Sequence, residues 1–289
     1  MRIVIHLQSL LLLPALFITC SIAIADSSSS KNDSTITLGV HPYLPAHEIK
    51  QRFTPLADHL GTQLHKKIEL KISQNYETHI EHVANNTVDI AFMGPSSYVT
   101  LTTTHGNYPL LARLEVKGKP HLFGVIFARD NSGLTDIKQL TGKRFAFGSP
   151  HSTMSYIVPR HMLNHDGISL DNLAEYKFLG NHRNVVLGVL LGEFDAGAAK
   201  EEVFLNFKDQ GLVSIARSPA ISEHLFVAGK GMPDRDLTLI RDLMLGLSKT
   251  KEGLQILQSI KPDITGLVPV KHSDYDSLAN FMTKEGAPH

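Results

Sequence analysis

The hydrophobic and polar positions of the chain follow two periods, one typical of strands and one typical of helices. Short runs rich in β-branched residues predict strands at 36–40, 68–72, 88–93 and 110–114. Amphipathic stretches between them predict helices at 54–64 and 76–86. Pro55, behind Thr54, suits the first turn of the first helix. Strands that alternate with helices form parallel sheets with helical crossovers, so the pattern predicts the α/β class.

A second series of the same kind follows. It predicts strands at 122–128, 144–148, 176–179, 194–198 and 212–216. It predicts helices at 156–165, 182–191 and 201–207. In each series a helix leads into a short strand with Asp at its second position, Asp89 or Asp195, a similarity too loose to indicate a repeat. Beyond residue 233 the pattern is mostly helical, apart from a strand at 266–270.

The N-terminus has the pattern of a secretory signal peptide at 1–25. Basic residues precede an apolar run at 7–24, and Ala23 and Ala25 supply small residues for cleavage. A polar linker at 26–34 follows. A retained membrane anchor and a lipoprotein acylated on Cys20 are the alternatives, although the residues before Cys20 fit a lipoprotein signal poorly. We therefore expect export and cleavage after Ala25.

Composition narrows the chemistry further. Cys20 is the only cysteine, so cleavage after Ala25 leaves no cysteine for a disulfide, thiol catalysis or a metal site. The 28 basic and 28 acidic residues balance, so no overall field directs the protein to nucleic acid or to a membrane. Any site for an anion must therefore be local.

Polar residues gather where predicted strands lead into helices. Ligands of open α/β sheets bind beyond the carboxyl ends of the strands, where helix N-termini present free N–H groups. Three such junctions are rich in polar side chains: Ser96 and Ser97; Ser152, Thr153 and Ser155; and His182 with Arg183. One hydroxyl is enough to cap a helix, and the second junction has three. That junction predicts an oxyanion site, with helix capping as the alternative.

Motifs of familiar enzymes and nucleotide sites are missing from the sequence. It contains no GxSxG, HExxH, Walker or GxGxxG element. Two histidine pairs at helical spacing, His79 with His82 and His161 with His165, lack a third ligand at familiar spacing. We therefore expect no catalysis, no metal and no cofactor. A cleft enzyme or metal carrier remains the alternative.

The sequence resembles the periplasmic phosphonate-, phosphite- and phosphate-binding proteins of ABC importers, within the type II periplasmic-binding superfamily. The resemblance covers nearly all of the chain beyond the predicted leader. Five segments carry it in order: LGVHPYLP at 38–45 with TPL at 54–56, VDIAFMGP at 88–95, LTGKRFAFG at 140–148, STMSYIVP at 152–159 and GEFDAG at 192–197.

The resemblance implies two α/β lobes with a ligand cleft between them, joined by two hinge strands. Lobe one would comprise residues 35–121 and a return segment at 223–289, with lobe two at 122–222. The crossings are expected near 121–127 and 222–228, where the similar runs HLFGV and HLFVA occur.

The implied function is that of a monomeric periplasmic solute-binding component, which passes a small phosphorus oxyanion to an inner-membrane ABC permease. A sensory receptor acting with a membrane sensor kinase is the alternative. Position in the family motifs assigns ligand contacts to Tyr43, Ser97, Ser152, Thr153, Ser155 and His182, and Asp195 aligns with a cleft carboxylate. Ser96 and Arg183 complete the candidates.

Two departures from the family pattern bear on the ligand. Met93 stands where relatives often have Tyr, and Arg183 stands where an acidic residue often follows the histidine. Arg disfavours an aminoalkyl cation, so phosphate, phosphite or a simple or acidic phosphonate is the better expectation. A surface salt bridge is the alternative role for Arg183.

Overall fold

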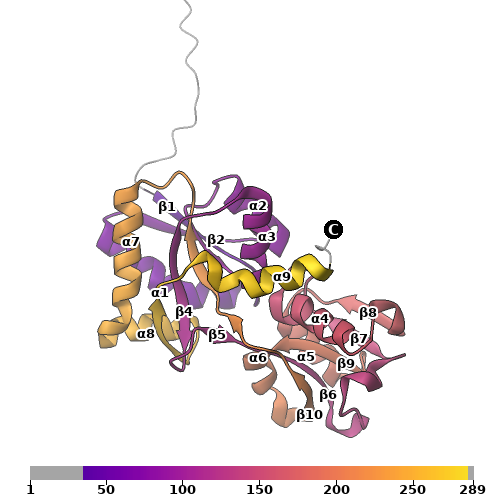
Figure 1. Cartoon of the computed structure of the whole chain (residues 1–289). Helices are drawn as coiled ribbons and strands as arrows, with labels where there is room; N and C mark the ends of the chain where they lie inside the picture. Colours follow the sequence, from indigo (N-terminus) through magenta and orange to yellow (C-terminus); the bar gives the residue numbers. More distant parts are fainter. Residues whose placement is uncertain (1–34, 286–289) are drawn as a thin grey trace, which may run out of the picture. The chain divides into compact units, whose positions relative to one another are not determined.

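The computed structural model describes residues 35–285, so the predicted leader, the linker and Cys20 lie outside the described residues (Figure 1). Two sheets organise the described chain. The six-stranded sheet has the order β13-β4-β12-β3-β1-β2, and the five-stranded sheet has the order β10-β6-β9-β7-β8. Below, lobe one denotes the first sheet with its helices, and lobe two denotes the second.

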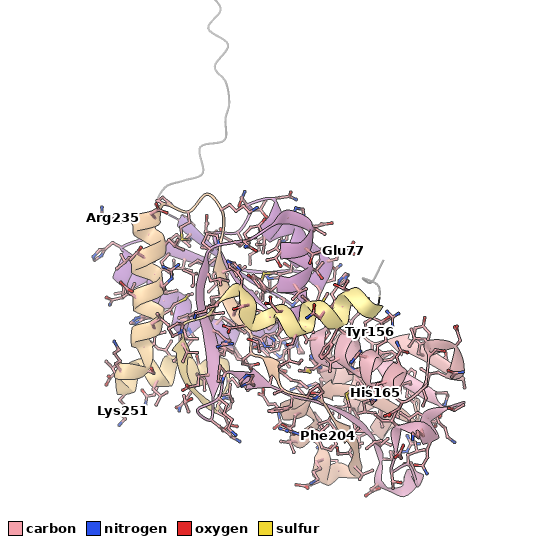
Figure 2. All side chains as sticks on the ribbon, viewed as in Figure 1. Glu77, Tyr156, His165, Phe204, Arg235 and Lys251 are labelled. Carbon is pink, nitrogen blue, oxygen red and sulfur yellow. The ribbon has the colours of Figure 1, made fainter. Side chains whose placement is uncertain are left out.

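Lobe one is built from both ends of the described chain. Its strands are β1 (Thr35–Val40), β2 (Lys67–Ile72), β3 (Ile90–Met93), β4 (Leu110–Val116), β12 (Leu225–Ala228) and β13 (Ile264–Val268). Its helices are α1 (Ala46–Leu64), α2 (Tyr76–Ala84), α3 (Pro95–His105), α7 (Asp234–Gly246), α8 (Lys251–Ile260) and α9 (Asp276–Glu285). Charged side chains such as Arg235 and Lys251 point outward from these helices (Figure 2).

Lobe two comes from the middle of the chain. Its strands are β6 (Gly124–Arg129), β7 (Arg144–Phe147), β8 (Glu175–Phe178), β9 (Ala196–Lys200) and β10 (Leu212–Arg217). A π-helical turn (Thr153–Ile157) leads into α4 (Val158–His165), and α5 (His182–Leu190) and α6 (Glu201–Leu205) follow.

The α/β class is confirmed, but the sheets are mixed, whereas the alternation of strands and helices predicted parallel sheets. β1 runs parallel to β2 and β3, and β7 runs parallel to β8 and β9. β12 instead enters lobe one from lobe two and inserts between β3 and β4, antiparallel to both. β6, which enters lobe two from lobe one, is likewise antiparallel to β9 and β10. In lobe two the reversed strand is the one on which the chain enters the sheet, whereas in lobe one both β12 and the edge strand β13, which is antiparallel to β4, are reversed.

The two connections between the sheets lie side by side. β5 (His121–Leu122) pairs antiparallel with β11 (Ile221–Ser222), so the outgoing and returning segments form a two-stranded ribbon. β5 precedes β6, the strand that enters lobe two, and β11 precedes β12, the strand that enters lobe one. This ribbon brings both connections to one place in the fold.

The first helix begins earlier than its periodicity predicts. It starts at Ala46 behind Pro45, and Pro55 lies inside it rather than in its first turn. The buried residues of the helix continue across this proline: Ile49, Phe53, Leu56, Ala57 and Leu60. Burial of this apolar stripe offsets the hydrogen bond that a proline in a helix interior removes.

Helix α9 contacts both lobes. Just before it, the Tyr275 ring lies 4.9 Å from the Tyr98 ring of α3, and the Tyr275 hydroxyl donates to the Glu223 carbonyl. Farther along α9, the Phe281 ring stacks on His161 of α4 at 4.5 Å.

No helix among residues 35–285 combines the length and apolar character that a membrane span needs.

Candidate functional site

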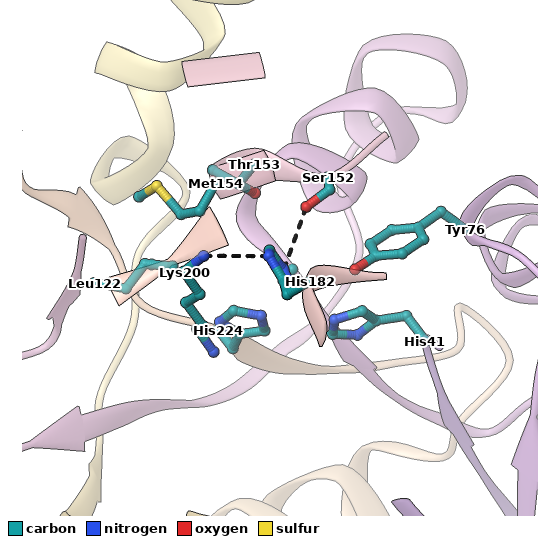
Figure 3. A pocket seen from close by; sticks show the side chains of 10 residues that line it. His41, Tyr76, Leu122, Ser152, Thr153, Met154, His182, Lys200 and His224 are labelled. Atoms are coloured by element: carbon teal, nitrogen blue, oxygen red, sulfur yellow. Dashed lines mark hydrogen bonds between the residues drawn. The ribbon is translucent and has the colours of Figure 1, made fainter. Parts of the chain in front are cut away.

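A small pocket lies where strand ends of the two lobes meet (Figure 3). Lobe one contributes residues that follow β1, β2 and β3 and one that precedes β12. Lobe two contributes the turn behind β7, the start of α5 and the last residue of β9. The lining residues are His41, Tyr76, Gly94, Leu122, Ser152, Thr153, Met154, His182, Lys200 and His224.

Ser152 combines the two roles weighed for its junction. Its side chain caps the helical segment that begins at Thr153, accepting from the Ser155 N–H at 3.4 Å. Its Oγ also lies 3.5 Å from His182 Nε2 at the pocket wall. The cap therefore faces the pocket, and its hydroxyl hydrogen is not used in capping.

Thr153 connects the two lobes. Its Oγ1 accepts from the Ser96 N–H at 3.0 Å, and Ser96 Oγ donates to the His151 carbonyl at 2.6 Å. Because the Ser96 hydrogen goes to that carbonyl, Thr153 is the donor in the 2.9 Å contact between the two hydroxyls. Two predicted residues from different lobes are thus brought together.

The proton of His182 can be placed from its neighbours. The Lys200 N–H donates to Nδ1 at 3.2 Å, so Nδ1 is an acceptor and Nε2 carries the hydrogen (Figure 3). Burial, together with Lys200 and His224, lowers the pKa of His182 to about 3. His182 is therefore a neutral imidazole that directs an N–H toward Ser152 and the pocket.

Lys200, which the sequence analysis missed, is a buried cation in the lining of the pocket. It is 7% exposed, and burial followed by the charge of Lys261 lowers its pKa. Among residues 35–285 no carboxylate forms a salt bridge with Lys200, because Glu202 and Glu223 both pair with Lys261, at 3.1 and 3.3 Å. Its Nζ instead lies 5.6 Å from the centre of the Tyr43 ring.

Two further histidines face the pocket with their Nε2 atoms. His41 Nδ1 lies 3.1 Å from the Phe92 carbonyl, and His224 Nδ1 lies 3.3 Å from a Glu223 carboxylate oxygen. A methyl group built on Gly94 would lie 3.7 and 3.6 Å from their respective Nε2 atoms and 3.9 Å from Thr153 Oγ1. Three polar atoms thus converge on the space beside Gly94.

These two imidazoles are neutral in the folded protein. Burial, followed by the nearby His224 and His79, lowers the pKa of His41 well below its usual value. Burial and Lys200 lower the pKa of His224 to about 4, although Glu223 opposes the shift.

Other predicted residues lie beside the pocket rather than in its lining. Tyr43 lines the adjoining cavity and its ring lies 5.0 Å from that of His41, while burial raises the pKa of its hydroxyl. The hydroxyls of Ser97 and Ser155 are buried and have no hydrogen-bond partner within the described part of the chain.

Arg183 and Asp195 are occupied by ion pairs. Arg183 Nη1 lies 2.5 Å from Glu48 Oε1, a pair that links lobe two to lobe one. Asp195 accepts from the Arg144 N–H at 2.9 Å and pairs with its guanidinium at 2.8 Å. Asp195 precedes β9, at the opposite end of that strand from Lys200, so the structure does not bring it to the pocket.

Asp195 and Asp89 share one structural role. The Asp89 carboxylate accepts the Thr37 N–H at 2.8 Å, as that of Asp195 accepts the Arg144 N–H. Each Asp immediately precedes its strand and binds the start of a neighbouring strand. The loose similarity between the two halves of the sequence therefore reflects a common way of fixing strand ends.

The histidine pairs singled out as possible metal ligands have other contacts. His79 Nδ1 and His82 Nδ1 lie 3.4 and 3.1 Å from the same hydroxyl, that of Ser73. The His161 ring stacks on Phe281. Within residues 35–285 no three side chains of His, Asp or Glu are placed to hold a metal ion together.

The rule that selected the serine-rich junctions also applies to two of the missed residues. His41 directly follows β1, and Lys200 is the last residue of β9, so both lie at carboxyl ends of strands. His224 carried no such signal. It precedes β12, and the antiparallel direction of that strand brings its beginning to the same edge.

Comparison with known proteins identifies the family. Residues 38–275 match the family model described as "ABC transporter, phosphonate, periplasmic substrate-binding protein". The phosphate-import protein PhnD of Mycolicibacterium smegmatis is 25% identical over 277 residues, which cover 88% of this chain and 86% of that protein. The probable phosphite-binding protein PhnD1 of Prochlorococcus marinus is 24% identical over 184 residues, 61% of each chain.

A solved structure shows the same fold. The structure of PhnD1 from Prochlorococcus marinus in complex with methylphosphonate superposes with a TM-score of 0.80 at 21% identity. The alignment covers 87% of this chain and 98% of that one. With the family match spanning most of the sequence, the chain belongs to the family of periplasmic substrate-binding proteins of phosphonate ABC transporters.

Proposed function

We propose that this chain is the exported, monomeric solute-binding component of an ABC importer, and that it passes a small phosphorus oxyanion from the pocket to an inner-membrane permease. The observation that carries the proposal is the buried ammonium of Lys200, which has no carboxylate partner among the described residues. A buried charge is costly unless it is paired, and an anionic ligand in the adjoining pocket supplies the pair.

The pocket also offers neutral donors suited to an oxyanion. His182 Nε2–H and the Ser152 hydroxyl lie side by side at its wall. Tyr76 brings a hydroxyl whose pKa burial raises, so that it keeps its proton, while a hydrogen bond with Ser152 opposes this shift. The first N–H groups of the segment that begins at Thr153 have no helical partner by position. Hydrogen bonds from such donors to an anion are stronger than those between neutral groups.

The tautomer of His182 favours binding over catalysis. In a Ser–His nucleophile the imidazole nitrogen beside the serine must accept the hydroxyl proton. Here Nδ1 accepts the Lys200 N–H, so the nitrogen beside Ser152 already carries hydrogen. Ser152 therefore has no base at this nitrogen, and we propose that the protein is not an enzyme.

A ligand screen with a matched pair of glycine variants tests the proposal. Phosphate, phosphite or methylphosphonate at about a hundred times its Kd should stabilise the protein by about 2.7 kcal/mol in thermal melts. Gly94→Ala should weaken binding about ten- to a hundredfold, because the methyl fills the space on which the three polar atoms converge. Gly94 has φ −73°, so alanine adds no backbone strain.

Gly231→Ala is the control, because nothing lies within 4 Å of its new methyl group. Its affinity should equal that of the parent protein. A melt that responds to no phosphorus oxyanion would contradict the proposed function. Equal ligand affinity of Gly94→Ala and the parent would place the ligand elsewhere.

The ion pair of Arg183 should contribute little to affinity. Its side chain is 40% exposed, and exposed pairs are worth about 0–1 kcal/mol. We expect Arg183→Met to change the Kd for methylphosphonate less than about fivefold in calorimetric titrations. The effect should shrink further in high salt, which screens the pair with Glu48. A loss of about a hundredfold would instead indicate direct contact between Arg183 and the ligand.

A further inference from the structure

Two imidazole nitrogens that can only accept hydrogen bonds face the pocket, beside the donors described above. The Phe92 carbonyl and the ionised Glu223 carboxylate can only accept, so the Nδ1 atoms of His41 and His224 carry the hydrogens of these imidazoles. Their Nε2 atoms are therefore free of hydrogen, and both lie at the space beside Gly94. The two rings stack with centroids 5.3 Å apart.

The surroundings keep both acceptors neutral before a ligand arrives. His41 packs among aromatic rings and the neutral imidazole of His79. The ammonium of Lys200 lowers the pKa of both His41 and His224. Glu223 is the acidic group nearest His224, and its charge is shared with Lys261. The titratable groups around the pair are Tyr43, Tyr76, His79, His182, Lys200, Glu202, Glu223 and Lys261.

An anion without a hydrogen cannot satisfy these acceptors. A bare oxyanion oxygen beside a hydrogen-free Nε2 brings two lone pairs together, whereas a P–OH group donates a hydrogen bond to the same nitrogen. Phosphates and phosphonates hold such a proton near neutral pH, because their second ionisation lies there. Sulfate and sulfonates are fully ionised in this range and have none to donate.

We propose that His41 and His224 make the pocket selective for oxyanions that carry a proton, so that it binds phosphorus oxyanions in preference to sulfate and sulfonates. This inference rests on the proposed function and names the determinant of its specificity. When a doubly ionised ligand binds, at least one proton enters the pocket from solvent. That proton lies in the hydrogen bond between a ligand oxygen and Nε2. The number of protons taken up on binding is the same whether the oxygen or the nitrogen holds it.

Calorimetric titration of the full chain tests the proton count. Methylphosphonate would be titrated at about pH 8.5, where it is doubly ionised, in Tris and in tricine, two buffers of different ionisation enthalpy without sulfonate or phosphorus. The difference between the observed enthalpies should correspond to uptake of about one proton or more per ligand. The affinity should fall as the pH rises, because the bound state holds more protons than the free components.

Methanesulfonate is the matched probe, with the same shape and no ionisable hydrogen. We expect it to bind at least about a hundredfold more weakly than methylphosphonate. In His41→Asn and His224→Asn the amide retains a donor near the Nδ1 position and removes the Nε2 acceptor. The preference for methylphosphonate over methanesulfonate should fall about tenfold or more in each variant.

His79→Asn is the control variant. His79 is buried near His41 but lies outside the pocket lining, so its removal should leave the proton count and the preference unchanged. Thermal melts identify any variant that fails to fold, and the proton count of the parent protein tests the proposal without a variant.

Equal affinities for methylphosphonate and methanesulfonate, or enthalpies that do not depend on the buffer, would overturn this inference and leave the proposed function intact. A protein that binds no phosphorus oxyanion would overturn the proposed function itself.

Discussion

Lys200→Met is expected to weaken ligand binding by about two to three orders of magnitude and to stabilise the ligand-free protein. Removing one partner of a buried charge pair costs about 2–5 kcal/mol of binding free energy. In the free protein, however, the ammonium is buried without a carboxylate partner among the described residues, and its pKa is lowered. A lowered pKa means that the folded protein disfavours the charged form of Lys200. Replacing it with methionine, an apolar side chain of similar length, should therefore raise the melting temperature.

Lys261→Met provides the contrast. Lys261 is a neighbouring, half-buried lysine, and it pairs with both Glu202 and Glu223. Breaking a buried pair from one side costs about 3–5 kcal/mol of stability, because a carboxylate is left uncompensated. Calorimetry and thermal melts on both variants should therefore give stability changes of opposite sign. Unchanged affinity in Lys200→Met would show that this ammonium does not bind the ligand.

Acid is expected to destabilise the ligand-free protein well above the pH at which carboxylates protonate. Burial first, with smaller effects of neighbours, lowers the pKa of His79 and His182 to about 3 and that of His224 to about 4. In the unfolded chain these histidines titrate near 6.5. Below that pH these histidines bind protons in the unfolded state but not in the native state. Their contribution to the free energy of unfolding is therefore fully present above about pH 6.5 and is lost progressively below it.

The expected loss is large. At about pH 5 each of the three histidines removes roughly 2 kcal/mol from the free energy of unfolding, about 6 kcal/mol together. Urea denaturation at pH 7 and pH 5 measures it, with ligand left out. His182→Gln, which cannot titrate, should lower the dependence on pH by about one proton. A free energy of unfolding that is flat between these pH values would contradict the assignment of buried neutral imidazoles.

The positions of the strands could be predicted from the sequence, but their directions could not. Residues 36–40 and 68–72 show β-branched runs, and the structure places β1 and β2 there; β1 is mostly buried, whereas the edge strand β2 is half-buried at Ile68, Leu70 and Ile72. Nothing in residues 225–228 reveals that β12 runs against β3, because direction depends on the path by which the chain returns from the other sheet. The purely local pattern therefore led to parallel sheets.

The candidate site divides in the same way. The cluster of hydroxyl residues at 152–155 predicted a binding site at this junction, and Ser152 and Thr153 line the pocket. Lys200 is a single basic residue after an alanine-rich strand, and its burial without a carboxylate partner depends on how Lys261 engages both nearby glutamates. Such pairing follows from tertiary packing and leaves no local pattern.

Helix α9 also makes the fold suitable for an optical sensor. Tyr275 anchors its start to lobe one, whereas the Phe281 ring rests on His161 of lobe two. Any rotation between the lobes must change this last contact, which involves no residue of the pocket lining. A dye that senses polarity, attached through Phe281→Cys, would convert that rotation into fluorescence. With Cys20 ahead of the predicted cleavage site, the mature chain would carry this cysteine alone.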